Sequence, residues 1–348
     1  MKAALLTGTK QIEVRDIPVP KPGPGEAVVQ VKASFVCGTD VRFFLNGKPG
    51  VDADHPLVLG HEIAGVIHET GEGVQGYEPG MRVAVAPNYG CGICDFCISG
   101  HSEMCTQSGA LGVTLNGGFS EFMLVPAPAV RQGNLASIPD GVSYPEAALV
   151  EPLSCVYNGY EKIGIYPGDT VLVIGSGPVG IMHCLVALMA GAARVFISDI
   201  SRERMDMATA IDSRIKQLPA GDHLPETLLK HNDGKLADLV ITAASVPAIQ
   251  EQAFSLVGQN ARVLFFGGLP KGKSVVSLDT NEIHYKQLTV TGTTRQSLRQ
   301  YRKCLELIGS GALSIKQIIT AEGRVEDVPQ AIEEARGGKG LKRVITLS

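Results

Sequence analysis

The stretch TVLVIGSGPVG, residues 170–180, decides the fold of the second half of the chain. Its apolar run predicts a buried strand that ends in a glycine-rich turn, and Val179–Ala190 predicts the helix that follows. In this context the glycines permit a tight turn, close approach of the backbone to a pyrophosphate, and close packing of helix on strand. The N–H groups and the dipole at the start of the helix favour phosphate. The stretch therefore predicts a dinucleotide-binding site.

A carboxylate follows where such a site requires one. Asp199 ends the next predicted strand, 19 residues after Gly180. It can accept hydrogen bonds from the adenosine ribose hydroxyls and it repels a 2′-phosphate, so NAD is favoured over NADP. A ligand-free strand–turn–helix is the alternative, and Arg202 and Arg204 could hold a 2′-phosphate or simply be solvated. The residues expected to contact the cofactor are Gly175, Gly177, Pro178, Val179, Gly180, Asp199 and Arg204.

The pattern of strands and helices divides the chain. From about residue 167, apolar strands alternate with helical stretches, which is typical of a doubly wound parallel sheet. The first 150 residues instead hold short β-like runs separated by Gly and Pro, which indicates an antiparallel, barrel-like domain. The expected strands are Ala27–Val31, Ile63–His68, Arg82–Ala86, Phe119–Val125, Thr170–Ile174, Arg194–Ser198, Leu239–Ala243, Arg262–Phe266, Leu288–Thr291 and Arg343–Leu347. Further helices are expected at 201–210, Tyr301–Ile308 and Val328–Ala335.

The composition excludes several classes of protein. With 348 residues the chain is long enough for two domains. A net charge of −4, with no dense run of Lys and Arg, gives no surface for nucleic acid. The opening residues contain no apolar stretch long enough for a signal peptide or a membrane span. We therefore expect a cytoplasmic protein, whose eight cysteines bind metal or stay free thiols rather than form disulfides.

Four of these cysteines lie close together in the sequence. Cys91, Cys94, Cys97 and Cys105 are spaced so that four thiolates can reach one tetrahedral ion. Because protein sulfur fills all four positions, no position stays open for water, and a zinc ion here is expected to be structural. An iron–sulfur cluster or unmetallated thiols are the alternatives, although nothing else in the sequence indicates one-electron chemistry.

Three further fragments carry donor groups: CGTD at 37–40, GHE at 60–62 and EPLSC at 151–155. Taken singly, each has an ordinary explanation as core or solvated side chains. Together with the four cysteines and GSGPVG, in this order and at these intervals, they resemble the zinc-containing medium-chain alcohol dehydrogenase superfamily. The resemblance is greatest to its sorbitol (polyol) dehydrogenase branch and covers essentially the whole chain. It includes GHEIAGV at 60–66, GGFSEF at 117–122 and GAL at 311–313.

This resemblance implies an α/β protein with two domains. One is a GroES-like β-barrel catalytic domain, formed by residues 1–153 and 290–348, which carries a catalytic and a structural zinc. The other is a Rossmann domain with a doubly wound parallel sheet, residues 154–289, which binds NAD. The analogy also implies a homotetramer or a homodimer, about which the sequence itself says nothing.

The resemblance also assigns residues to the catalytic centre. Cys37 and His61 match ligands of the catalytic zinc, and Glu62 matches the carboxylate that binds or approaches that zinc. Glu151 occupies the third-ligand position, where many alcohol dehydrogenases have Cys and the polyol branch has Glu. Arg295 falls where polyol dehydrogenases place an arginine near that glutamate and the substrate.

The implied activity is that of an oxidoreductase that converts a secondary alcohol to a ketone, with hydride transfer to NAD. Zinc with three protein ligands keeps a position for the substrate hydroxyl and lowers the pKa of that hydroxyl, so that an alkoxide forms near neutral pH. Thr39 aligns with the family hydroxyl that hydrogen-bonds this alkoxide and passes its proton outward.

One position departs from the family pattern. Three residues after Thr39 many relatives have a His that completes a proton relay, whereas this chain has Arg42. Arginine is not deprotonated at ordinary pH and cannot be that base. Either the relay runs through water, organised by Glu62 or Glu151, or Arg42 has another role. It could bind an anionic group such as a sugar-alcohol phosphate, or it could be a surface arginine in a salt bridge.

Three functions therefore stay open. The first is a dehydrogenase of polyols, free or phosphorylated, that interconverts a secondary alcohol and a ketose. The second is an L-threonine 3-dehydrogenase-like enzyme, although no acid that would bind the ammonium can be placed. The third is a non-catalytic zinc protein of the same fold, against which the intact Cys37, His61, Glu151 and GSGPVG argue.

Overall fold

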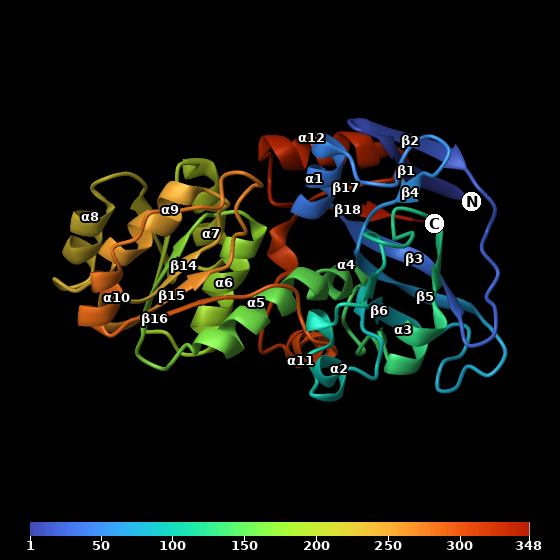
Figure 1. The fold of residues 1–348 in the computed structure, drawn as a ribbon, viewed down its shortest axis with the longest axis horizontal. Coiled ribbons are helices and arrows are strands. Elements are labelled where there is room, and N and C mark those ends of the chain that lie inside the picture. The colour runs from blue at the N-terminus through green and yellow to red at the C-terminus, as the bar shows by residue number, and fades with distance from the viewer. Residues whose placement is uncertain (348) are drawn as a thin grey trace. The chain divides into compact units, whose positions relative to one another are not determined.

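The computed structural model describes residues 1–347 and consists of two compact units (Figure 1). Unit 1 comprises Met1–Ser154 and Gln296–Ser348, and unit 2 comprises Cys155–Arg295. The sequence places the corresponding boundaries at 153/154 and 289/290, whereas the units divide at 154/155 and 295/296. Arg295 is therefore the last residue of unit 2, and Gln296 belongs to unit 1.

Unit 2 is built on one parallel sheet. Its elements after α5 (Val150–Ile163) are β11 (Thr170–Ile174), α6 (Pro178–Met189), β12 (Arg194–Asp199), α7 (Arg202–Ile211), β13 (Ile215–Pro219), α8 (Leu224–His231), β14 (Ala237–Thr242), α9 (Pro247–Gln252), β15 (Val257–Phe265), α10 (Thr280–Lys286) and β16 (Thr289–Gly292). The strand order is β13-β12-β11-β14-β15-β16, and all five pairings are parallel. The expected doubly wound sheet is confirmed. Its direction of winding reverses between β11 and β14, the position at which such sheets bind dinucleotides.

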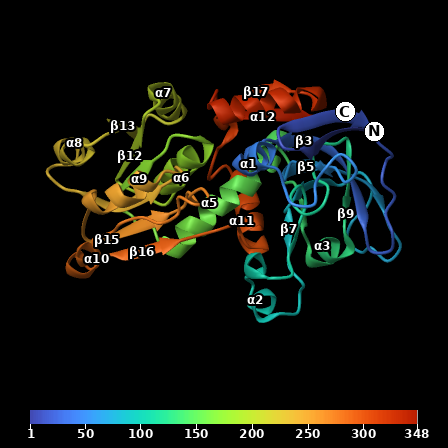
Figure 2. The same ribbon diagram turned by 45° about the horizontal axis from the view of Figure 1, so that its top comes forward.

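The central strands of this sheet are apolar on both faces because helices cover both sides (Figures 1 and 2). Every residue of β11 is buried. The edge strand β13, in contrast, has only two buried residues, Ile215 and Leu218. It carries Lys216 and Gln217 and has no apolar run, which is why the sequence pattern did not indicate it.

Unit 1 contains a mostly antiparallel sheet, to which the end of the chain returns, together with smaller sheets. Its strands are β1 (Lys2–Gly8), β2 (Gln11–Asp16), β3 (Ala27–Phe35), β4 (Leu57–Val58), β5 (Glu62–Thr70), β6 (Arg82–Val85), β7 (Asn88–Tyr89), β8 (Gly109–Ala110), β9 (Phe122–Val125), β10 (Leu135–Ser137), β17 (Ile319–Gly323) and β18 (Lys342–Thr346). Its helices are α1 (Gly38–Asn46), α2 (Asp95–Ile98), α3 (Ala127–Gln132), α4 (Tyr144–Ala148), α11 (Leu298–Gly309) and α12 (Val328–Gly337). The larger sheet has the order β10-β6-β5-β3-β18-β17, and β9 also pairs with β3.

Strand β3 is the centre of that sheet, since it pairs with β5, β9 and β18. Seven of its nine residues are buried, and it carries the core valines Val29 and Val31. The expected strand at Phe119–Val125 is shorter than predicted and begins at Phe122. Phe119 lies instead in a turn, where its N–H donates to the Leu59 carbonyl at 3.0 Å and its carbonyl accepts from Ala4 at 2.8 Å.

Within residues 1–347, every helix is too short or too polar to cross a membrane.

One buried histidine makes the stability of unit 2 depend on pH. His183, on α6, is 1% exposed, and its Nε2 has no hydrogen-bond partner in the described chain. Its ring packs edge-on against Phe266, with the centroids 4.5 Å apart. Burial lowers the pKa of His183 to about 3. Since an unfolded histidine has a pKa of about 6.5, the unfolded state binds more protons between these values. Stability is therefore full above pH 6.5 and falls as the pH decreases.

We expect His183→Leu to remove this pH dependence. Between pH 7.5 and pH 5.0 the wild type should lose roughly 2 kcal/mol of unfolding free energy through His183, at about 1.4 kcal/mol per pH unit below 6.5. The variant should not lose this amount, as measured by chemical denaturation at both pH values. His223→Leu is the matched control, because the His223 side chain is 95% exposed and its removal should leave the wild-type loss. Equal losses in His183→Leu and the wild type would contradict the argument.

Candidate functional site

Three potential metal ligands meet beyond the end of β3 in unit 1. The Cys37 sulfur, a ring nitrogen of His61 and a carboxylate oxygen of Glu62 all lie within 4.8 Å of one another. Strand pairing brings them together, because Phe35 on β3 pairs with Glu62, the first residue of β5. His61 and Glu62 are buried, and Cys37 is partly exposed. Thiolate, imidazole and carboxylate are the ligands that zinc binds in proteins, and three of them leave one position open.

Buried polar atoms without partners show that these residues fit a metal ion. Glu62 Oε2 and His61 Nδ1 are buried and have no hydrogen-bond partner in the described part of the chain. A buried carboxylate oxygen without a partner is costly, and a bound cation removes that cost. Cys37, His61 and Glu62 would therefore hold a zinc ion.

Asp40 fixes the positions of two of these ligands. Its carboxylate is fully buried; Oδ2 accepts the Cys37 N–H at 2.8 Å, and Oδ1 accepts the Gly60 N–H at 3.3 Å. Oδ1 also lies 3.6 Å from His61 Nδ1. Burial acts to lower the pKa of His61, but the negative charges of Cys37 and Asp40 outweigh it and raise that pKa well above its ordinary value. The raised pKa means that His61 holds a proton more firmly, and a metal that binds the imidazole must displace this proton.

Glu151 is buried at the same centre but is not one of the three clustered ligands. It lies in the first turn of α5, and its Oε1 accepts a hydrogen bond from Gln296 Nε2 at 3.2 Å. Burial raises the pKa of Glu151, and the charge of Glu62 adds to this effect, while His61 and Lys342 oppose it. The structure therefore groups Glu62 with Cys37 and His61, and places Glu151 beside them.

Besides Gln296, two buried residues at this centre were missed by the sequence analysis. Lys342 forms an ion pair with Glu62 Oε1 and donates to the Val36 carbonyl at 3.0 Å. Tyr301, on α11, is fully buried, and its hydroxyl has no partner among residues 1–347. Burial raises the pKa of Tyr301, and the charge of Glu151 raises it further. A lysine in a terminal strand and a tyrosine in a helix carry no motif, so no sequence signal indicated either residue.

The remaining residues expected at the catalytic centre belong to two different units. Thr39 is in the first turn of α1, and the exposed guanidinium of Arg42 lies 3.5 Å from its hydroxyl. Arg295 ends unit 2 with a left-handed backbone, φ 57°, and its carbonyl accepts from Asn158 at 3.0 Å. The next residue, Gln296, donates a hydrogen bond to Glu151.

The four clustered cysteines converge as the spacing predicts. The sulfurs of Cys91, Cys94, Cys97 and Cys105 all lie within 4.8 Å of one another, and every cysteine of the chain is a free thiol. The lobe that carries them, around α2, projects from the rest of unit 1 (Figure 2).

The surroundings of this cluster suit a metal as well. Backbone N–H groups of Ile93 and Cys94 lower the pKa of Cys91 to about 6, whereas burial raises the pKa of Cys97 to about 12. A bound cation would allow all four thiols to ionise. The backbone at Gly90 passes so close that a Cβ there would lie 2.4 Å from the Cys97 sulfur. These four residues would hold the structural zinc.

The predicted dinucleotide loop has the geometry that the glycines require. It joins β11 to α6, with Gly177 as the N-cap and Pro178 and Val179 in the first turn of the helix. A Cβ at Gly180 would lie 1.8 Å from the Gly175 carbonyl oxygen, so a side chain there would force the helix away from the strand. A Cβ at Gly177 would meet nothing within 4 Å, which leaves open space beside the N-terminus of the helix.

Asp199 is placed beside this loop by strand pairing. It ends β12, and its Oδ2 accepts the Ser176 N–H at 2.5 Å while Oδ1 accepts the Ser201 N–H at 2.9 Å. Arg204 follows in α7, and its Nε is buried without a partner in the chain described. One end of the unit 2 sheet therefore carries the glycine loop, the Asp199 carboxylate and Arg204.

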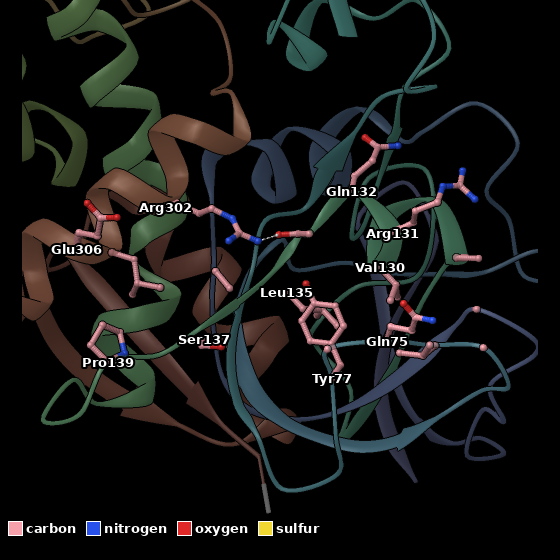
Figure 3. A pocket seen from close by; sticks show the side chains of 18 residues that line it. Gln75, Tyr77, Val130, Arg131, Gln132, Leu135, Ser137, Pro139, Arg302 and Glu306 are labelled. Atoms are coloured by element: carbon pink, nitrogen blue, oxygen red, sulfur yellow. Dashed lines mark hydrogen bonds between the residues drawn. The ribbon is translucent and has the colours of Figure 1, made fainter. Parts of the chain in front are cut away.

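One hollow of unit 1 lies away from these residues. It has a volume of about 800 Å³ and is lined by residues such as Tyr77, Gln132 and Arg302, whose guanidinium donates to the Gly133 carbonyl (Figure 3). None of the metal-ligand candidates lines it. This hollow is therefore separate from the candidate metal ligands.

We expect Asp40→Asn to release the catalytic zinc selectively. Both oxygens of Asp40 accept backbone N–H groups, and an amide would direct its NH₂ at one of these donors. Loss of such a supporting contact typically weakens metal binding by about 10- to 100-fold. Zinc content after dialysis against a mild chelator should therefore fall from about two to about one per chain. The exposed Asp54→Asn serves as control and should retain both ions; retention of both ions by Asp40→Asn would refute this role.

Comparison with known proteins identifies the family. The chain matches the alcohol dehydrogenase GroES-like domain at residues 23–139 and the zinc-binding dehydrogenase family at residues 178–310. D-xylulose reductase A from Aspergillus niger is 30% identical over 349 residues, covering 98% of this chain and 95% of that protein. Sorbitol dehydrogenase from Bacillus subtilis strain 168 is 30% identical over 338 residues, covering 96% and 93%.

A solved structure extends this likeness to three dimensions. The crystal structure of a zinc-binding dehydrogenase from Sinorhizobium meliloti 1021, bound to NADP, matches with a TM-score of 0.90 at 28% identity. The match covers 99% of this chain and 98% of the other. The sequence families, the full-length relatives and the shared fold agree: the chain belongs to the zinc-containing medium-chain alcohol dehydrogenase superfamily, in its sorbitol (polyol) dehydrogenase-like branch.

Proposed function

We propose that this protein oxidises a secondary alcohol of a polyol or sugar alcohol to the ketone and transfers the hydride to NAD. The observation that carries the proposal is the cluster of Cys37, His61 and Glu62, which offers a metal three donors and leaves one position for a hydroxyl. Relatives named for D-xylulose and sorbitol support a polyol as the substrate class.

The chain's own residues would divide the work around this position. Zinc, when bound, supplies a Lewis acid that lowers the pKa of a hydroxyl. Thr39 lies two residues beyond Cys37; its hydroxyl would take the proton that the substrate hydroxyl loses and pass its own proton outward. Glu151 and Arg295 are the proposed substrate-side residues, and Gln296 would orient the Glu151 carboxylate through their hydrogen bond.

We assign the coenzyme to the loop at residues 175–180 and to Asp199. The open space beside Gly177 and the N–H groups that begin α6 suit a pyrophosphate. The Asp199 carboxylate is held by Ser176 and Ser201, so its negative charge stays at the site of the ribose and disfavours a 2′-phosphate. Arg204 is the one basic group proposed at the cofactor, and NAD remains our assignment because Asp199 opposes the phosphate.

Two further predictions accompany this proposal. The family resemblance implies a homotetramer or homodimer, and the sequence implies a cytoplasmic location.

The direct test is nucleotide reduction, followed at 340 nm, on free polyols, polyol phosphates, inositols and L-threonine, each with NAD and with NADP. We expect turnover on one polyol class, a preference for NAD, and loss of activity with a chelator that removes the catalytic zinc. Turnover of L-threonine instead would transfer the protein to the amino-acid branch. Coenzyme binding without turnover of any substrate would leave the fold in place and remove the polyol assignment.

Arg42 provides a test of whether the substrate carries a phosphate. Its guanidinium and the Lys48 ammonium both lie within 6 Å of the Phe43 ring, and neither cation forms an ion pair within residues 1–347. We expect Arg42→Gln to raise the KM for polyol phosphates by about tenfold, the effect of losing roughly 1.4 kcal/mol of charge-assisted binding. The KM for free polyols should change little. The exposed Arg336→Gln is the control, and an equal effect on both substrate classes would exclude phosphate recognition by Arg42.

A further inference from the structure

A buried ion pair borders the candidate metal ligands. Lys342 is only 7% exposed, and its ammonium contacts Glu62 Oε1 and the Val36 carbonyl. Glu62 is fully buried, and its second oxygen, Oε2, has no hydrogen-bond partner in the described residues. A cation therefore holds one oxygen of this carboxylate, while the other oxygen is left for a different partner.

Strand register produces this arrangement. On β3, Phe35 pairs with Glu62 on one side and with Val344 on the other. Lys342 lies two residues before Val344, at the start of β18. It therefore reaches Glu62 across the end of β3, at Val36, the residue directly before the ligand Cys37. The contact is fixed by the backbone of three neighbouring strands rather than by a mobile loop.

We infer that Lys342 is a positioning residue: it holds Oε1 of Glu62, so that the carboxylate offers only Oε2 to a metal bound by Cys37 and His61. The inference rests on the metal site of the proposed function. A carboxylate can bind a metal through one oxygen or through both. With Oε1 held by Lys342, the metal receives three protein donors and keeps one position for the substrate.

Stability alone gives no comparable reason for this ion pair. Burial of two charges carries a desolvation cost that offsets much of their attraction, and well-packed apolar residues often serve a core as well. Here the surroundings are those of an active centre, since a carboxylate oxygen of Glu62 lies within 4.8 Å of the Cys37 and His61 donors. The pair thus acts on the geometry of the ligand set.

Two substitutions of Lys342 should change the metal site in opposite directions. Lys342→Met frees Oε1, so Glu62 would bind through both oxygens, add a donor, and slow metal release by about tenfold. Lys342→Arg places a planar guanidinium opposite the Glu62 carboxylate, and this group donates hydrogen bonds to both carboxylate oxygens together. That variant would withdraw Oε2 from the metal and speed metal release by about tenfold.

The measurement uses cobalt(II) at the catalytic site, with zinc retained at the four-cysteine site, and requires neither substrate nor coenzyme. Visible absorption distinguishes four-coordinate cobalt, which absorbs strongly, from five-coordinate cobalt, which absorbs weakly. We expect strong absorption in the wild type and in Lys342→Arg, and weaker absorption in Lys342→Met. Release of cobalt to an excess of chelator gives the rates.

A second background shows whether Lys342 acts through Glu62. In Glu62→Gln, no second carboxylate oxygen can bind the metal, so adding Lys342→Met should alter neither the absorption nor the release rate. This double variant also leaves no uncompensated buried charge. The exposed Lys339→Met controls for loss of a positive charge near the end of the chain.

The inference is overturned if both Lys342 variants keep the wild-type absorption and release rate, or if Lys342→Met has the same effect with and without the Glu62 carboxylate. Lys342→Arg retains the charge, so it carries the test if Lys342→Met does not fold. Failure of the protein to oxidise polyols would count against the proposed function alone, because the cobalt measurements involve no turnover.

Discussion

The pairing of β3 with β5 on one side and β18 on the other is the constraint on which unit 1 depends. This pairing joins segments from the beginning, the first third and the end of the chain in one sheet. Charged side chains accumulate at the edge of the sheet where the pairing ends. Glu62 and Lys342 lie on the two flanking strands, and Cys37 follows the central one. The core of the sheet is apolar, so this end carries nearly all of its buried charge. The active centre is thus a consequence of strand register.

The two local motifs of the chain could be predicted from sequence because each folds within a short segment. The four cysteines span 15 residues from Cys91 to Cys105, and their convergence needs only a few tight turns. The loop at residues 175–180 needs one strand and one helix, and its glycines are required by contacts as close as that between Gly180 and the Gly175 carbonyl. In both cases residue spacing already contains most of the geometry.

The catalytic centre could not be derived in that way, since its groups come from distant segments. The resemblance to a family indicated Cys37, His61, Glu62 and Glu151, but it did not indicate which carboxylate lies nearest the other ligands. It also pointed to Arg295, and the fold adds the neighbouring Gln296, whose Nε2 donates a hydrogen bond to Glu151 Oε1. The left-handed backbone at Arg295, φ 57°, turns the chain between these two neighbours. A sequence pattern of period two or 3.6 contains no such turn.

Lys342 is the clearest case of a residue that only the fold explains. A shift of one residue in the pairing of β18 would move its side chain to the other face of the sheet, where a lysine would be solvated. In the observed register it is buried among Glu62, Glu151 and Cys37, whose negative charges raise the pKa of Lys342 against the opposing effect of burial. Lys342 pairs with only one of these anionic groups, Glu62, and the buried Asp40 carboxylate adds further negative charge beside His61. A divalent cation between Cys37, His61 and Glu62 would offset negative charge that the protein's own lysine leaves uncompensated.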